Sequence, residues 1–321
     1  MKILTNHAGR NTSPTWAKFT TYIPSNKPGL FSYIASAVRM LSQKKHHDII
    51  VLGAGRADII FLLLNKLFVL HRIPIIVIDC LWYETDNQIK HYLKRKLFRF
   101  IDADISRYVV WASREIEAYS SCFGLPIEKF VFIPYHNTVH EEIDSSVGSY
   151  FFSGGNFGRD YKTLIEAVRG LDVNLLIAST RPELFDDINV PSNVEIKGFS
   201  HSDYVKKMAN CYANIVALDA SLLHSGGQQT FLNSMCLGKP TVVTDPDGGA
   251  DYIEDGVDGF LVESGNPKKL REKIIYLSEN VDISLKIGQR AKDRASKLNT
   301  EYHFIKIVDL AKEVLEEKVS K

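Results

Sequence analysis

A glycine pair that leads into a short predicted helix is the part of this sequence best suited to do chemistry. Residues 224–230 are His-Ser-Gly-Gly-Gln-Gln-Thr, and Gly238 ends the helix before a β-branched strand. Free N–H groups at a helix start, with the positive end of its dipole, attract an anion, and glycines let the backbone approach a ligand closely. The segment therefore predicts a phosphate-binding loop. The alternative is an ordinary tight turn with a helix cap, which explains the two consecutive glutamines poorly.

A second glycine-rich loop carries a cation that suits a phosphate group. Residues 153–160 are Ser-Gly-Gly-Asn-Phe-Gly-Arg-Asp and lie between a predicted strand and a predicted helix. The fork of Arg159 can make two charge-assisted hydrogen bonds to phosphate oxygens. The alternative for Arg159 is a surface ion pair with Asp160 or Glu166. Lys162 is a lesser candidate that could simply be solvated on the first turn of the helix.

Strands and helices alternate along the chain, and this alternation must position both loops. In the first half we expect strands over 2–5, 48–52, 74–79, 108–112 and 130–134, with helices near 28–44, 56–72, 86–102 and 114–123. In the second half we expect strands over 150–153, 173–178, 194–196, 213–218, 241–244 and 260–262, with helices near 160–170, 202–210, 229–237 and 267–279. The pattern predicts an α/β protein with parallel, doubly wound sheets, in which ligands collect beyond the carboxyl ends of the strands.

Length and charge limit the possible domain organisation and partners. A chain of 321 residues exceeds one ordinary core and indicates two domains. The polar segment 136–147 is the predicted linker. The chain has 39 basic and 38 acidic residues, so its net charge is near zero and we expect no nucleic-acid partner.

The remaining sequence features indicate an ordinary intracellular protein. The four cysteines, at positions 80, 122, 211 and 236, are far apart and form no Cys-x-x-Cys pair. We expect structural thiols and no metal site. The chain starts Met-Lys-Ile-Leu-Thr-Asn without an apolar leader, so we expect a cytoplasmic location. The longest apolar run, 59–70, is too short to span a membrane and is expected to form a buried helix.

Three runs in the second half resemble the nucleotide-sugar domain of GT-B glycosyltransferases, especially the group-4-like family. They are Gly-Gly-Asn-Phe-Gly-Arg-Asp-Tyr-Lys-Thr-Leu-Ile-Glu-Ala at 154–167, Met-Cys-Leu-Gly-Lys-Pro-Thr-Val-Val at 235–243, and Asp-Gly-Gly-Ala-Asp-Tyr-Ile-Glu-Asp-Gly-Val-Asp-Gly-Phe-Leu-Val at 247–262. The resemblance implies two Rossmann-like domains facing across a cleft. Residues 1–140 would bind the acceptor and 148–300 the nucleotide sugar, and 301–321 would form a C-terminal helix that crosses back to the first domain.

The resemblance implies transfer of a sugar from a nucleoside diphosphate sugar to a hydroxyl group of a glycan or lipid-linked acceptor. The setting would be bacterial surface polysaccharide or glycolipid synthesis, with a UDP- or GDP-linked donor as substrate and no separate cofactor. A sugar-nucleotide epimerase and a non-catalytic glycosyltransferase-like subunit are the alternatives. The candidate donor-binding residues are Asn156, Arg159, Lys162, Phe199, Ser225, Gly226, Gly227, Gln228, Gln229, Thr230 and Asn233.

One departure from the family concerns two Glu residues, eight positions apart, that usually contact the donor sugar and the ribose. Ser225 and Asn233 stand at those positions, so the resemblance leaves retention or inversion of the anomeric configuration open. Asn233 could still bind a ribose hydroxyl, and Gln228 or Gln229 could bind sugar hydroxyls. Phe199 lies where the family holds the nucleobase, or else is a core aromatic residue.

The first half is less explicit about its catalytic group. His7, in the loop after the first strand, could be a general base, because the unperturbed pKa of histidine lies near neutrality. Asp79, Glu84 and Asp86, after the third predicted strand, compete for this role. Each of the four could instead only hydrogen-bond within its loop.

The predicted helix over 88–101 is basic and amphipathic, with cations Lys90, Lys94, Arg95, Lys96 and Arg99. Such a helix can lie on an anionic membrane surface, which suits a lipid-linked acceptor. The alternative is a helix docked on the sheet with a solvated basic face. Two Asp-x-Asp pairs, at 102–104 and 245–247, imitate a metal site, but we expect neither to bind a metal. The first lies between a predicted helix and a predicted strand, and the second is a turn before Gly248.

Overall fold

The computed structural model describes residues 1–24, 29–68, 72–141, 143–219 and 222–319. The chain divides into two compact units. Unit 1 comprises Met1–Pro134 and Thr300–Lys321, and unit 2 comprises Tyr135–Asn299. Within the described residues, no helix combines the length and the apolar character needed to cross a membrane.

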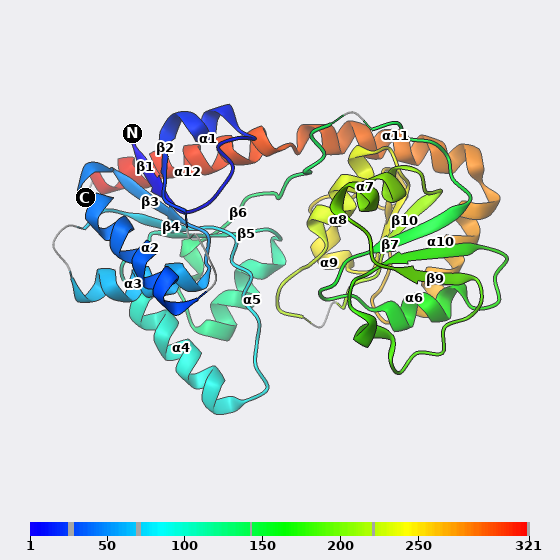
Figure 1. The fold of residues 1–321 in the computed structure, drawn as a ribbon, viewed down its shortest axis with the longest axis horizontal. Coiled ribbons are helices and arrows are strands. Elements are labelled where there is room, and N and C mark those ends of the chain that lie inside the picture. The colour runs from blue at the N-terminus through cyan, green and yellow to red at the C-terminus, as the bar shows by residue number, and fades with distance from the viewer. Residues whose placement is uncertain (25–28, 69–71, 142, 220–221, 320–321) are drawn as a thin grey trace. The chain divides into compact units, whose positions relative to one another are not determined.

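Unit 1 is a six-stranded parallel sheet covered by helices (Figure 1). Its strands lie in the order β2-β1-β3-β4-β5-β6. They are β1 (Ile3–Thr5), β2 (Thr20–Tyr22), β3 (Ile49–Leu52), β4 (Ile75–Val77), β5 (Arg107–Val110) and β6 (Phe130–Phe132). The helices are α1 (Pro14–Phe19), α2 (Leu30–Gln43), α3 (Arg56–Leu67), α4 (Gln88–Asp102), α5 (Arg114–Phe123) and α12 (Thr300–Val319), with short 3-10 segments η1 (Lys44–His46) and η2 (Ile127–Lys129).

Unit 2 repeats this architecture with the strand order β12-β11-β10-β7-β8-β9, again parallel. Its strands are β7 (Tyr150–Gly154), β8 (Asn174–Ala178), β9 (Val194–Lys197), β10 (Ala213–Val216), β11 (Thr241–Val243) and β12 (Phe260–Leu261). Its helices are α6 (Tyr161–Val168), α7 (His201–Ala209), α8 (Gln228–Cys236), α9 (Pro246–Gly249), α10 (Pro267–Glu279) and α11 (Val281–Lys297), with η3 (Pro182–Phe185) of 3-10 type. The predicted α/β class with two doubly wound sheets is confirmed.

The strand order reverses direction once in each unit. In unit 1 the chain moves from β1 to β2 on one side and then to β3 on the other side of β1. In unit 2 it moves from β7 to β8 and β9, and β10 then returns to the other side of β7. The loops that leave the carboxyl ends of β1 and β3, and of β7 and β10, diverge at these reversals and open a crevice.

The central strands are buried on both faces because helices cover both sides of each sheet. The four residues of β3, Ile-Ile-Val-Leu, are completely buried. This explains why continuous apolar runs, rather than alternating ones, marked the strands in the sequence. The predicted helix over 56–72 is observed as α3 as far as Leu67, and residues 69–71 lie outside the described part of the chain.

The segment between β1 and α2 holds two elements that were not predicted, α1 and β2. Ser13 caps α1 by accepting a hydrogen bond from the backbone N–H of Trp16, and Pro14 occupies the first turn. A Ser-Pro pair before a helix is a recognisable start. The helix is only six residues long, too short for its periodicity to stand out.

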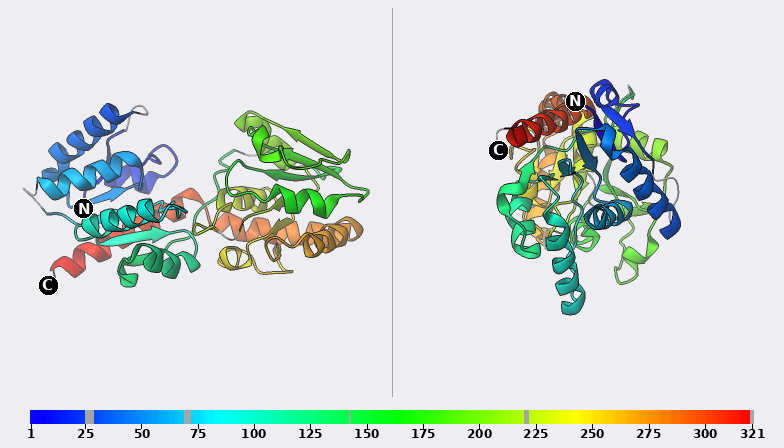
Figure 2. Two further views of the ribbon diagram at one scale, coloured as in Figure 1. Left: turned by 90° about the horizontal axis from the view of Figure 1, so that it is seen from below. Right: turned by 90° about the vertical axis from the view of Figure 1, so that its left-hand side faces the viewer.

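Helix α12 belongs to the core of unit 1. It packs against α1 (Figures 1 and 2). Phe304 is buried and stacks on Trp16 with ring centroids 4.7 Å apart. Apolar residues of α12 and of the strands β1, β3, β4 and β5 form one cluster with this pair.

We predict that Phe304→Ala destabilises unit 1 by about 3–5 kcal/mol, because it removes a buried ring and leaves a cavity beside Trp16. Thermal and urea unfolding followed by tryptophan fluorescence would measure the change. Ile305→Ala is the control, since Ile305 is adjacent and 37% exposed. Equal unfolding midpoints for the two variants would contradict the role of α12 in this core.

Candidate functional site

The start of α8 is an uncapped helix end, as an anion site requires. Gly227 precedes the helix in the left-handed region, with φ 85°, and provides no side-chain cap. An added Cβ at Gly227 would lie 3.0 Å from Val216 and Leu218, so glycine is required there. Within the described residues, no side chain accepts from the amides of Gln228, Gln229 or Thr230.

Arg159 is fastened beside this helix end. Its Nη2 donates to Thr230 Oγ1 at 3.0 Å, and its Nε donates to the carbonyl of Gly154 at 3.0 Å. Gly155, with φ 126°, lies so close to the guanidinium that an added Cβ would be 2.6 Å away. The side chain is therefore held across the loop that follows β7, next to the first turn of α8.

The alternative of an ion pair for Arg159 is not found. Asp160 instead accepts from the amide of Thr163 and caps α6. Glu166 pairs with Arg169 at 2.8 Å. In the described part of the chain Arg159 therefore has hydrogen bonds to neutral oxygens and no carboxylate partner. A half-buried cation without a counter-ion attracts an external anion.

A pocket of about 340 Å³ lies within unit 2 at the carboxyl ends of β7, β8 and β9. Five of the predicted donor residues line it: Asn156, Phe199, Gln229, Thr230 and Asn233. The pocket also contains residues that the sequence analysis did not single out: Gly155, Ala178, Ser179, Thr180, His201 and Tyr204. They lie at or just beyond the carboxyl ends of β7 and β8 or in the first turn of α7, so the rule that ligands bind beyond strand ends could have found them.

Asn156 joins two of the loops around this pocket. Its Oδ1 accepts from Ser179 Oγ at 2.9 Å and from the amide of Thr180 at 3.1 Å, while its Nδ2 donates to Thr180 Oγ1 at 2.9 Å. These bonds use most of the amide's capacity. The geometry indicates that Asn156 holds the loop after β7 in place against the loop after β8.

Asn233 and Gln229 share a partner that the sequence did not indicate. Asn233 is 4% exposed, and its Oδ1 accepts from the amide of Thr138 at 2.7 Å. Thr138 Oγ1 accepts from Asn233 Nδ2 at 3.0 Å and from Gln229 Nε2 at 3.1 Å. Asn233 therefore ties the segment around residue 138 to α8.

The other predicted donor residues lie outside this pocket. Ser225 and Gln228 are buried, and an added Cβ at Gly248 would lie 2.5 Å from Ser225 Oγ. The Nε2 of Gln228 has no hydrogen-bond partner among the described residues. Lys162 is exposed on the first turn of α6.

In unit 1, two of the competing catalytic candidates contact each other. His7 follows β1 and Asp79 follows β4, and His7 Nε2 lies 2.8 Å from Asp79 Oδ2. His7 Nδ1 lies 2.5 Å from the carbonyl of Ala8. Because both ring nitrogens face acceptors, the pair favours the imidazolium form. Burial would lower the pKa of His7, but the hydrogen bond and charge of Asp79 outweigh it, so the pKa is raised.

Asp58, which the sequence analysis missed, completes this cluster. It accepts from the amide of Gly55 at 2.7 Å and from Asn6 Nδ2. Burial raises the pKa of Asp58 to about 6. Asp58 is the third residue of α3 and satisfies an amide at its start, which is a capping pattern visible in the sequence.

The backbone around the dyad is unusual at two positions. Ala54 has φ 58° and Asp79 has φ 55°, and both lie where strands β3 and β4 lead into loops. Left-handed backbone at residues other than glycine is strained and clusters at functional sites. Glu84 is exposed and lies apart from this pair. Of these two acidic candidates, Asp79 therefore contacts His7 and Glu84 does not.

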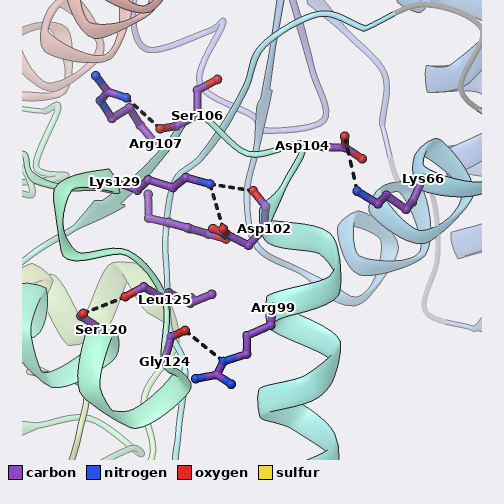
Figure 3. A network of polar contacts seen from close by, with 11 residues as sticks. Lys66, Arg99, Asp102, Asp104, Ser106, Arg107, Ser120, Gly124, Leu125 and Lys129 are labelled. Carbon is purple, nitrogen blue, oxygen red and sulfur yellow. Dashed lines mark hydrogen bonds and ion pairs between the residues drawn. The ribbon is translucent and has the colours of Figure 1, made fainter.

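The Asp-x-Asp pair at 102–104 is neutralised by lysines. Asp102 Oδ2 accepts from Lys129 Nζ at 2.9 Å, and Asp104 lies 3.9 Å from Lys66 Nζ (Figure 3). In the second pair, Asp245 Oδ1 accepts from the amide of Gly248 at 3.0 Å, as a turn residue does. Among the described residues, no group of three or more His, Cys, Asp or Glu could hold a metal ion.

Comparison with known proteins agrees with the predicted resemblance. Residues 156–280 match the family model described as Glycosyl transferases group 1. An uncharacterized glycosyltransferase of Methanocaldococcus jannaschii is 27% identical over 183 residues, 53% of this chain and 50% of that relative. The poly(ribitol-phosphate) alpha-N-acetylglucosaminyltransferase of Staphylococcus aureus is 26% identical over 121 residues, 37% of this chain and 24% of that relative. The matches thus span half or less of these relatives' length.

Solved structures show the same fold. The Anabaena protein HepE, crystallised with UDP and glucose, has a TM-score of 0.72 at 13% identity, with 97% of this chain and 99% of that chain covered. TarM of S. aureus has a TM-score of 0.63 at 17% identity, with 86% and 58% covered. With the family match, these likenesses confirm the GT-B fold and the predicted resemblance to group-4-like enzymes.

We predict that Asp79→Asn lowers the pKa of His7. Burial lowers this pKa, and the substitution removes the negative charge that raises it. An NMR titration of the His7 ring would show a midpoint above 6.5 in the wild type and a lower midpoint in the variant. Asp86→Asn is the control, since Asp86 is exposed in the same loop. An unchanged midpoint in the Asp79 variant would show that the two side chains do not pair in solution.

Proposed function

Because residues 156–280 carry a domain of the glycosyl transferases group 1 family in a chain with the GT-B fold, we propose that this protein is a glycosyltransferase. It transfers a sugar from a nucleoside diphosphate sugar to a hydroxyl group. The observation that carries the proposal is the bond from Arg159 Nη2 to Thr230 Oγ1, which holds an unpaired cation over the uncapped start of α8. Positioned donors of this kind stabilise the charge that develops on a leaving diphosphate.

The donor is a UDP- or GDP-linked sugar, and no separate cofactor takes part. HepE was crystallised with UDP and with UDP-glucose, which supports a uridine donor. The pocket beside Thr230 has a volume of about 340 Å³, within the range of small-molecule sites. Phe199 provides an apolar wall for a base. Arg159 and the α8 amides provide the positive charge that a metal ion supplies in other enzymes.

His7 is the general base in this proposal. Asp79 holds Nε2–H, so the base nitrogen is Nδ1 once an acceptor hydroxyl replaces the Ala8 carbonyl. Nδ1 takes the hydroxyl proton while the acceptor oxygen attacks the anomeric carbon and the nucleoside diphosphate leaves. The absence of carboxylates at positions 225 and 233, together with this dyad, favours inversion of configuration.

The acceptor is a surface glycan or a lipid-linked glycan. The S. aureus relative is named for transfer to poly(ribitol-phosphate), which supports a cell-surface polymer. The basic segment 88–101 supports action at the inner face of a membrane, where a lipid-linked acceptor is exposed to the cytoplasm. We therefore place the protein in the cytoplasm, in surface polysaccharide or glycolipid synthesis.

We predict that Arg159→Ala weakens UDP binding on the order of 10- to 100-fold, since charge-assisted hydrogen bonds to the diphosphate are lost. Isothermal titration with UDP measures this. Lys162→Ala is the control, because Lys162 is an exposed cation on the adjacent helix. Unchanged UDP affinity in the Arg159 variant would overturn the assignment of the diphosphate site.

A panel of UDP-, GDP- and dTDP-sugars then tests the activity. Slow release of free nucleotide by the wild type, lost in the Arg159 variant, supports transfer. Interconversion of the sugars without nucleotide release would indicate an epimerase. Failure to bind any donor would indicate a non-catalytic subunit.

We predict that the transfer rate rises with pH through the pKa of His7, which lies above 6.5, because only neutral imidazole can accept the proton. Asp79→Asn should move the half-maximal rate to lower pH and reduce the plateau about 100-fold or more. The measurement is kcat against pH at saturating donor. A profile that is flat, or the same in both proteins, would remove His7 from the reaction.

A further inference from the structure

Asp58 is a buried carboxylate that has no cation of its own. Its side chain is 3% exposed, and among the described residues no Lys or Arg forms an ion pair with it. It borders a cavity of about 20 Å³ whose other lining residues are aliphatic or aromatic, including Leu62, Trp82 and Phe98. Burial of an unpaired charge is unfavourable, and a neutral amide could accept the same hydrogen bond at the start of α3. The capping bond alone therefore does not explain a carboxylate at this position.

The two oxygens of Asp58 tie together two loops at the carboxyl end of the sheet. Oδ2 accepts from the amide of Gly55, in the loop after β3, at 2.7 Å. Oδ1 accepts from Nδ2 of Asn6, in the loop after β1. Strands β1 and β3 are neighbours in the sheet, so one side chain can reach both loops. Asn6 directly precedes His7, which places this bond one residue from the dyad.

The ring of His7 lies between several elements and is sensitive to where its loop is held. An added Cβ at Gly53, in the loop after β3, would lie 3.5 Å from His7 Cδ2. On α12, the ring of Phe304 has its centroid 5.6 Å from that of His7. Nε2 of His7 must still lie within hydrogen-bond distance of Asp79 Oδ2, which is 2.8 Å away. A shift of the loop after β1 would therefore change the geometry of the dyad directly.

Asp58 also acts on His7 through its charge. Burial lowers the pKa of His7, Asp79 raises it most, and Asp58 raises it further. Burial raises the pKa of Asp58, and the charge of His7 lowers it. The other titratable group in this cluster is His303 on α12. Burial lowers the pKa of His303, so its side chain is neutral at pH 7. The imidazole of His7 is thus influenced by two carboxylates, one in contact and one behind its loop.

We propose that Asp58 is a positioning residue for His7. Through Asn6 it holds the loop after β1, so that His7 meets Asp79 in the orientation that proton transfer requires. The inference rests on the proposed function for the reaction that the dyad serves. The position of His7 itself depends on neither donor nor acceptor, so it can be measured in the protein alone.

Asn6→Ala tests the bond between the loops, because it removes the donor to Asp58 Oδ1 and leaves the bond to Gly55 and the start of α3 intact. We expect kcat to fall about 10- to 100-fold, since a small displacement of a reacting group costs this much. The KM for the donor should stay the same, because the proposed donor site lies in unit 2. Asn87→Ala is the matched control: Asn87 caps α4 by accepting from the amide of Lys90 at 3.0 Å, away from the loop after β1. It should retain the wild-type kcat.

Asp58→Asn and Asp58→Ala separate the geometric role of this residue from its charge. In Asp58→Asn the new amide can accept from Gly55 and donate to Asn6 Oδ1, a buried atom that has no partner among the described residues. This variant should therefore keep a kcat about tenfold above that of Asp58→Ala. Its half-maximal rate should move to lower pH, because a charge that raises the pKa of His7 is lost.

An NMR titration of the His7 ring, without any substrate, separates this inference from the proposed function. The midpoint should be highest in the wild type, lower in Asp58→Asn and lowest in Asp79→Asn. This order, with a reduced kcat in Asn6→Ala, supports the positioning role. The same order in a protein that releases no nucleotide from any donor would retain the role of Asp58 and overturn the transferase. A wild-type kcat in Asn6→Ala, or a wild-type midpoint in Asp58→Asn, would overturn the positioning role and leave the transferase in place.

Discussion

The hydrogen bond between Arg159 and Thr230 joins the two loops on which the proposed donor site depends. One partner follows β7 and the other opens α8, after β10, so the bond spans the point where the strand order of unit 2 reverses. The guanidinium is held by carbonyl and hydroxyl oxygens, which fix its position without neutralising it. A carboxylate in place of these oxygens would form an ion pair with the guanidinium and neutralise it. The cation stays available because its partners are neutral.

The sequence predicted the fold well where local and tertiary preferences agree. Buried strands such as β3 are continuous apolar runs, and the glycines around α8 mark its ends, so periodicity and turn residues located both. The elements α1 and β2 were missed because they are short and depend on contacts of Trp16 with the distant Phe304. No local pattern reports such a contact.

The candidate site was predicted in part. The residue types of Arg159 and Thr230 predict an anion site, and the structure brings the two side chains together. The sequence could not show that Thr138 would engage Asn233, since the two are far apart in the chain. It also could not decide between His7 and Asp79, which the structure shows to be partners. Periodicity also could not show that apolar residues of α2 such as Phe31 are exposed, because a helical pattern is the same whether its apolar stripe meets a sheet or solvent.

The left-handed backbone at position 79 restricts which residue types can stand beside His7. With φ 55°, position 79 accepts glycine, asparagine or aspartate readily and penalises most larger or branched side chains. Of the three, only aspartate carries a negative charge. Glutamate would offer a carboxylate on a longer stem, but at the cost of backbone strain. The backbone conformation at position 79 thus limits which side chains can pair with the His7 imidazole. The pKa of His7 therefore depends on this backbone conformation as well as on the chemistry of its partner.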